Sequence, residues 1–106
     1  KQIKAFVHHI RSAAVVEALR DAGVTNITLL DVKGTLKPLS ESEQAYSTEV
    51  GVVIISEVRV SFVCDDADVP RITDTIRRAG RIGEGVSGWV YVSPVEQALP
   101  IGGPDH

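Results

Sequence analysis

One pattern of apolar and amphipathic runs occurs twice in this sequence and constrains the fold more than any other feature. Each copy has a run with apolar residues at alternate positions, then an amphipathic run that ends in Ala-Gly, then a second apolar run. Alternation with a period of two predicts strands, and apolar residues at i, i+4 and i+7 predict helices. The six runs lie at residues 1–8, 12–22 and 27–34 in the first copy and at 52–64, 68–79 and 89–93 in the second.

The element order that follows, β-α-β-β-α-β, is that of the ferredoxin-like split β-α-β fold of the α+β class. We expect a four-stranded antiparallel sheet with both helices on one face. Residues that favour helix ends support these bounds. Ser12 is a good N-cap, Gly23 suits the left-handed residue after a helix, and Pro70 fits a first helical turn. Residues 94–99 are expected to form a further short turn of helix.

The strands carry apolar side chains on both faces, because apolar residues adjoin one another at Ala5-Phe6, Phe62-Val63 and Trp89-Val90. An antiparallel sheet with one solvated face alternates more cleanly. Since the helices cover one face only, we expect other copies of the chain to cover the second. Ligand clefts would then lie where subunits meet.

Length, charge and cysteine content exclude several classes of protein. The 106 residues predict one domain, which we place at residues 1–99 with a flexible tail over residues 100–106. A net charge of −3 argues against a general binder of nucleic acid or anionic membranes. The single cysteine, Cys64, excludes an internal disulfide and a cysteine-rich zinc site. No run approaches the roughly 20 apolar residues of a membrane helix and no signal-peptide core is present, so we expect a cytoplasmic protein.

Residues 35–53 separate the two copies and follow neither period. Between Thr35 and Val50 the sequence contains three glutamates, three serines and few apolar residues. Loops of this length inside a compact domain are usually functional or disordered. We therefore predict a long functional loop here.

Residues 80–88, which we call the glycine loop, join the second helix to the last strand and contain four glycines at GxxGxGxxG spacing. Successive exposed N–H groups in such a loop form a concave nest for anions, most often phosphate. The order helix, loop, strand differs from the strand, loop, helix order of the Rossmann and Walker motifs. Two interpretations stay open: a phosphate-binding loop and a plain helix-to-strand turn.

Other clusters of polar residues favour structural roles. His8 and His9 are neighbours on a strand and point to opposite faces, so they are poorly placed to share a metal ion. The acidic residues 65, 66 and 68 suit a helix N-terminus and lack the rest of a calcium loop. Cys64 continues an inward-facing stripe. No nucleophile stands beside a base at a recognisable spacing, so we expect neither an enzyme nor a metal site.

Several segments, taken in order, resemble those of the PII signalling proteins. They are Ile3–Val7, Glu17–Gly23, Val32-Lys33-Gly34, Asp74-Thr75-Ile76 and Gly80-Arg81-Ile82-Gly83-Glu84-Gly85. The last is similar to the family's B-loop, Gly-Lys-Ile-Gly-Asp-Gly, and the long loop stands where the family has its T-loop. The resemblance covers nearly the whole chain apart from the C-terminal tail.

The resemblance implies a homotrimer that binds an adenine nucleotide between neighbouring subunits, holds no other cofactor, and regulates a partner protein through the T-loop. By position, one group of residues would hold the phosphates and another would line the base pocket. The first group is Arg81, Ile82, Gly83, Glu84 and Gly85, and the second is Thr28, Gly34 and Val63.

This chain also departs from the family at the phosphate site. Val86 stands where the family has a phosphate-binding lysine, and residues 94–99 contain no cation where the family has arginines. Each missing cation removes a charge-assisted hydrogen bond of roughly 1.5–3 kcal/mol. A triphosphate carries the most charge and loses most, so ADP or AMP should compete well with ATP.

The site for a second ligand differs as well. Glu57 stands where the family has a lysine that contacts 2-oxoglutarate, and a carboxylate repels a dicarboxylate. Divergent subgroups of the family are associated with bicarbonate transporters and carboxysome genes. The resemblance therefore suggests a regulator that responds to bicarbonate through Lys33, Lys37 or Arg59 and docks on a membrane transporter or carboxysome-related protein. Tyr46 is out of register with the tyrosine that some members carry for uridylylation, so its modification is not expected.

Three alternatives stay open. One is a standard nitrogen-regulatory PII protein that senses ATP and 2-oxoglutarate. Another is a trimeric metal-tolerance protein of the CutA type, which shares the fold and lacks a nucleotide loop. The third is a structural trimer whose glycine loop is only a turn. Binding of ADP would separate the metal-tolerance protein and the structural trimer from a PII-like protein.

Overall fold

The computed structural model of this chain describes residues 1–36 and 54–103. Its elements follow the order β-α-β-β-α-β, which confirms the predicted fold class. Two short 3₁₀ turns, η1 and η2, precede the helices. The bounds are β1 Gln2–His8, η1 His9–Arg11, α1 Ser12–Asp21, β2 Thr28–Gly34, β3 Ile55–Val63, η2 Asp66–Asp68, α3 Val69–Ala79 and β4 Gly88–Ser93.

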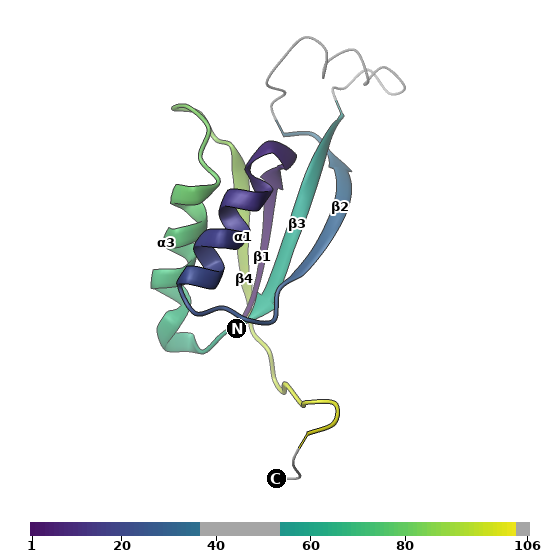
Figure 1. Cartoon of the computed structure of the whole chain (residues 1–106), viewed down its shortest axis with the longest axis vertical. Coiled ribbons are helices and arrows are strands. Elements are labelled where there is room, and N and C mark those ends of the chain that lie inside the picture. Colours follow the sequence, from purple (N-terminus) through teal and green to yellow (C-terminus); the bar gives the residue numbers. More distant parts are fainter. Residues whose placement is uncertain (37–53, 104–106) are drawn as a thin grey trace.

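The four strands form one antiparallel sheet in the order β2-β3-β1-β4. Both helices lie on the same face of this sheet (Figure 1). The central pair is β1 and β3, in which Ala5 is opposite Val60. The two edges are β2 and β4, so the long loop begins at one edge and the glycine loop ends at the other.

The hydrophobic core lies between the sheet and the helices. From β1, Ile3, Ala5 and Val7 point into it, as their alternation predicted. The helices contribute Val15 and Leu19 from α1 and Ile72 and Ile76 from α3, and the third strand contributes Val58, Val60 and Phe62. Full burial of one such aliphatic side chain is worth about 1.5–3 kcal/mol, so this cluster is the main source of stability.

The helix ends agree with the sequence at Gly23 and Pro70 and differ at Ser12. Gly23 has a φ of 94°, and Pro70 lies in the first turn of α3. Ser12 is not an N-cap, because it already has helical backbone angles and its hydroxyl donates to the carbonyl of His9 at 2.8 Å. The 3₁₀ turn η1 takes up the start of the helix instead. Its cap is His8, whose Nδ1 accepts from the N–H of Ile10 at 3.3 Å.

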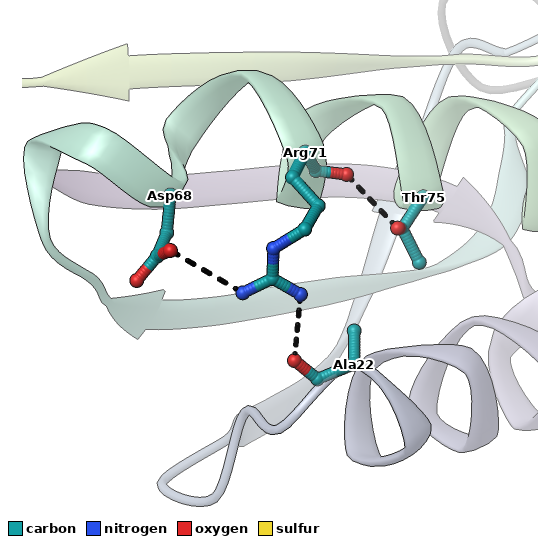
Figure 2. A network of polar contacts seen from close by, with 4 residues as sticks. All are labelled: Ala22, Asp68, Arg71 and Thr75. Carbon is teal, nitrogen blue, oxygen red and sulfur yellow. Dashed lines mark hydrogen bonds and ion pairs between the residues drawn. The ribbon is translucent and has the colours of Figure 1, made fainter.

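The end of α1 is capped from the neighbouring helix (Figure 2). The guanidinium of Arg71 donates to the carbonyl of Ala22 at 2.8 Å and also lies 3.4 Å from the carboxylate of Asp68. The hydroxyl of Thr75 donates to the carbonyl of Arg71 at 2.9 Å. The last carbonyls of a helix have no partner inside the helix, so Arg71 ties the C-terminal end of α1 to the start of α3.

The second face of the sheet is left uncovered by the helices. Register places Leu30, Val63, Trp89 and Tyr91 on this face, and all four are exposed. Phe6 packs edge to face on Tyr91 with ring centroids 6.0 Å apart. Apolar side chains therefore occupy both faces, as the strand sequences predicted. Cover by other copies of the chain stays a prediction.

Two predicted segments differ from the structure. The third strand was predicted to begin at residue 52, whereas β3 begins at Ile55 and residues 52–53 lie outside the described residues. The predicted turn of helix over residues 94–99 is wrong, since this segment is irregular and leads away from the sheet (Figure 1). Leu99 is 77% exposed. A helix this short does not persist without packing.

Gly88 allows β4 to pair closely with β1. It is opposite Val7, and a Cβ at Gly88 would lie 3.3 Å from the carbonyl carbon of Phe6 and closer still to its oxygen. A Cβ at Gly85, by contrast, would have no atom within 4 Å. Gly88 is therefore a packing requirement of the sheet as well as the last residue of the glycine loop.

We predict that Gly88→Ala lowers the free energy of unfolding by about 1–3 kcal/mol, since backbone must move to admit the methyl group. Gly85→Ala is the matched control and should change it by less than about 0.5 kcal/mol. Urea denaturation of both variants and the parent at one protein concentration measures this. Equal stabilities for the two variants would contradict the predicted close approach.

Candidate functional site

The glycine loop begins where α3 ends and is closed by Ser87. Gly80 ends the helix, and its N–H donates to the carbonyl of Ile76 at 2.9 Å. The hydroxyl of Ser87 accepts from the N–H of Ile82 at 2.7 Å and donates to the carbonyl of the same residue at 2.9 Å. This side chain thus bridges the two sides of the loop. Ser87 was not singled out from the sequence, because no spacing rule predicts this role.

The middle of the loop presents backbone amides to solvent. Gly83 has a left-handed φ of 62°, and residues 83–85 are all exposed. The side chain of Arg81 folds over the loop, and its Nε donates to the carbonyl of Gly83 at 2.9 Å. Within the part of the chain that the structure describes, the N–H groups of Gly83, Glu84 and Gly85 donate no hydrogen bond. Successive amides beside a left-handed residue make the nest geometry that binds anions.

An open groove of about 620 Å³ runs between the glycine loop and the C-terminal end of α3. Three arginines line it, namely Arg77, Arg78 and Arg81. Arg77 and Arg78 are both exposed, and Arg78 is paired at 2.9 Å with Asp74, which also lines the groove. The groove also includes Glu84, whose carboxylate opposes an anion. Guanidinium groups at a helix C-terminus are favoured by the helix dipole.

The sequence prediction named Arg81 and missed the other two arginines. The signal that would have found them was present, because Arg77 and Arg78 directly follow Ile76 in the last turn of a helix that ends at the glycine loop. The charge deficit inferred from Val86 is therefore smaller than the sequence comparison suggested. Val86 itself lines the groove and is exposed.

A single chain does not bring the predicted base-pocket residues to the glycine loop. Thr28 is opposite Ser61 and Val63 is opposite Gln2, at the end of the sheet where β2 begins and β3 finishes. The glycine loop enters the sheet at the other end, beside Val7. Gly34 shares that end but lies on the β2 edge, whereas the glycine loop is on the β4 edge. Each chain thus holds the glycine loop apart from the predicted base-pocket residues, which are themselves divided between the two ends of the sheet.

Gly34 and Glu57 fit together at the base of the long loop. A Cβ on Gly34 would overlap the Glu57 carboxylate, so only glycine fits here without moving that side chain. Glu57 is 5% exposed, and its Oε2 accepts from the N–H of Leu36 at 3.1 Å. The carboxylate therefore caps the chain as it enters the long loop. Residues 37–53 of the predicted loop lie outside the described residues.

The cations predicted for a second anion do not converge in one chain. Lys33 is opposite Ser56 on the helix-covered face, whereas Arg59 is opposite Phe6 on the uncovered face. Lys37 lies outside the described residues. Among the residues that the structure does describe, the Nε of Arg59 is buried and has no hydrogen-bond partner. Arg59 is thus the better placed of the two described cations for an anion on the uncovered face.

The remaining polar candidates have structural surroundings. His9 leaves the strand in η1, so the rings of His8 and His9 stack with centroids 4.6 Å apart and do not point to opposite sides as predicted. In residues 1–36 and 54–103, no three His, Cys, Asp or Glu side chains gather as a metal site. Burial raises the pKa of the Cys64 thiol, which disfavours the reactive thiolate. No helix in those same ranges is long and apolar enough to cross a membrane.

Comparison with known proteins agrees with this arrangement. The model of the family described as Nitrogen regulatory protein P-II matches residues 1–102. A protein of that name from Nostoc punctiforme is 31% identical over 101 residues, which cover 95% of this chain and 90% of that protein. Its namesakes from Bradyrhizobium diazoefficiens and Synechocystis, with the same coverage, are 32% and 26% identical. The fold, the glycine loop and these matches together show that the chain belongs to the P-II family of regulatory proteins.

Proposed function

We propose that this protein is a PII-like signalling protein that binds ADP or AMP between the subunits of a homotrimer. The observation that carries the proposal is the row of three exposed, unbonded amides at Gly83, Glu84 and Gly85 beside an arginine-lined groove. Amides of this kind and guanidinium groups are the usual donors to phosphate oxygens. The protein acts as a cytoplasmic regulator and carries out no catalysis of its own.

A site between subunits follows from the separation of its two halves. The phosphate half is the glycine loop at the β4 edge, and the predicted base residues lie on β2 and β3, with Thr28 and Val63 at one end of the sheet and Gly34 at the other. A nucleotide that contacts both halves takes the first from one chain and the second from its neighbour. The exposed apolar residues of the uncovered face provide the contact area that such an assembly buries.

The preference for ADP or AMP over ATP follows from where cations are missing. Arg77, Arg78 and Arg81 supply positive charge near the loop, but Val86 supplies none at its far side. Residues 94–103 lead away from the sheet, starting at the end opposite the glycine loop (Figure 1). Their charged member, Glu96, is acidic. An outer phosphate therefore has fewer donors in this chain than the inner ones.

Bicarbonate is the second ligand that we propose, with Arg59 as its cation. The buried Nε of Arg59 has no partner among the described residues, and a small planar monoanion matches one guanidinium edge. Glu57, two residues along the same strand face, disfavours a dicarboxylate such as 2-oxoglutarate. The long loop would then carry the signal to a protein partner, for which a membrane transporter or a carboxysome-related protein is our proposal.

A second candidate is a nitrogen regulator that senses ATP and 2-oxoglutarate. The printed name of the relatives, Nitrogen regulatory protein P-II, favours it. The buried Glu57 carboxylate, which already accepts the N–H of Leu36, weighs against it in this chain. Binding of 2-oxoglutarate in the presence of ATP, and not of bicarbonate with ADP, would decide in its favour.

We predict that saturating ADP or AMP raises the melting temperature more than ATP does at equal concentration. A ligand at 100 times its Kd stabilises the folded protein by about 2.7 kcal/mol. Arg81→Gln and Arg77→Gln each remove one charged donor, so each should weaken ADP binding about tenfold or more. Arg20→Gln changes an exposed arginine of α1 outside the groove and is the matched control.

Thermal-shift and isothermal titration measurements on the four proteins test this prediction. An unchanged melting temperature with all three nucleotides would rule out the proposed function and leave the glycine loop as a turn. A uniform loss of affinity in all three variants, Arg20→Gln included, would show that net charge rather than the groove controls binding.

We predict that bicarbonate changes the affinity for ADP, and that Arg59→Gln removes this change whereas Lys33→Gln keeps it. The two residues lie on opposite faces of the sheet, so only one of them faces a ligand on the uncovered side. Titration of ADP with and without bicarbonate, at constant pH and ionic strength, measures the effect. An effect that survives Arg59→Gln and disappears with Lys33→Gln would move the anion site to the other face.

A further inference from the structure

The glycine loop is held at its first peptide by Arg11, a residue far away in the sequence. The Nε and Nη2 of Arg11 both donate to the carbonyl oxygen of Ala79, at 3.0 Å and 2.7 Å. Ala79 is the last residue of α3, and Arg11 is the last residue of η1, 68 positions earlier. Two charged donors on one oxygen fix both the distance and the direction of approach.

This contact controls the orientation of the peptide that opens the loop. The carbonyl of Ala79 and the N–H of Gly80 belong to one planar peptide unit. Arg11 holds the carbonyl side, while the N–H of Gly80 donates to Ile76 at 2.9 Å on the other side. A plane fixed on both sides sets the direction in which residues 81–85 leave the helix.

Space around the joint is limited in the same region. A Cβ on Gly80 would lie 3.2 Å from the carbonyl oxygen of Ile76 and 3.4 Å from Val7. A side chain at this position would therefore press against the end of the helix and against Val7. Arg11 itself is half-buried, so its hydrogen bonds compete less with water than those of a surface arginine.

We propose that Arg11 is a positioning residue for the glycine loop, which sets the direction of the loop amides that bind the nucleotide phosphates. The inference rests on the proposed function for its ligand and on the Arg11–Ala79 contact for its geometry. Arg11 caps the C-terminal end of α3 in the same way that Arg71 caps that of α1. Only the cap on α3 adjoins a candidate binding loop.

The two arginines form a matched pair for an experiment. Arg11 binds the carbonyl at the end of α3, and Arg71 binds the carbonyl of Ala22 at the end of α1. Either loss leaves one helix end uncapped, so Arg11→Gln and Arg71→Gln should cost similar stability. Only Arg11→Gln should loosen the glycine loop. Arg11→Lys keeps one charged donor and tests for partial rescue.

Hydrogen exchange of the ligand-free protein gives a readout that needs no nucleotide. We expect the hydrogen-bonded amides of Gly80, Arg81 and Ile82 to exchange faster in Arg11→Gln than in the parent, and those beside Ala22 to exchange faster in Arg71→Gln. Titration with ADP should show binding about tenfold weaker for Arg11→Gln, about threefold weaker for Arg11→Lys, and within about twofold of the parent for Arg71→Gln, where tenfold corresponds to 1.4 kcal/mol.

The outcomes separate the two proposals. If the parent binds ADP and Arg11→Gln behaves like Arg71→Gln in both affinity and loop exchange, the positioning role is wrong while the proposed function stands. If the parent binds no nucleotide, the proposed function is wrong, and the exchange of residues 80–82 alone decides whether Arg11 holds the loop. Should Arg11→Gln fail to fold, the same comparison applies to Arg11→Lys.

Discussion

The pairing of β1 with β3 at the centre of the sheet is the interaction on which the rest of this structure depends. Ala5 lies opposite Val60 and Ile3 opposite Phe62, and all four side chains are buried under the helices. A slip of one residue would turn the whole apolar row of β1 to the other face. The same register brings the base of the long loop and the entry of the glycine loop to one end of the sheet.

That register also keeps the two loops apart. The long loop starts from β2 and the glycine loop leads into β4, and these strands are the two edges of the sheet. Gly34, at the base of the long loop, and Gly88, at the end of the glycine loop, therefore lie at one end of the sheet but on its opposite edges. The uncovered face carries exposed apolar side chains, and a patch of this kind is typical of a surface that binds another protein. Assembly of several chains would cover this apolar face and would bring the glycine loop of one chain close to another chain.

The sequence predicted what depends on local periodicity and missed what depends on long-range contacts. Alternation in β1 and the spacing of Ile72 and Ile76 are local, and both elements formed where predicted. Ser12 looked like a cap, but the preceding 3₁₀ turn had already started the helix. Arg11 donates to the carbonyl of Ala79, 68 positions later in the sequence. A hydrogen bond to a backbone carbonyl cannot be predicted from the spacing of side-chain types. The glycine loop could be predicted because its glycines are close together in the sequence. The contacts that Arg11 and Ser87 make with it could not be predicted.

Net charge and local charge lead to opposite expectations for this chain. A net charge of −3 disfavours long polyanions, since repulsion acts along their whole length. The proposed nucleotide would meet only the groove, where three arginines stand beside amides that make no hydrogen bond within the described part of the chain. Interactions over more than about 8 Å are largely screened at physiological ionic strength, so the acidic remainder of the surface contributes little there. A net negative charge is therefore compatible with the proposed binding of a small phosphate ester. In this proposal the geometry of the loop, rather than the total charge, would select the ligand.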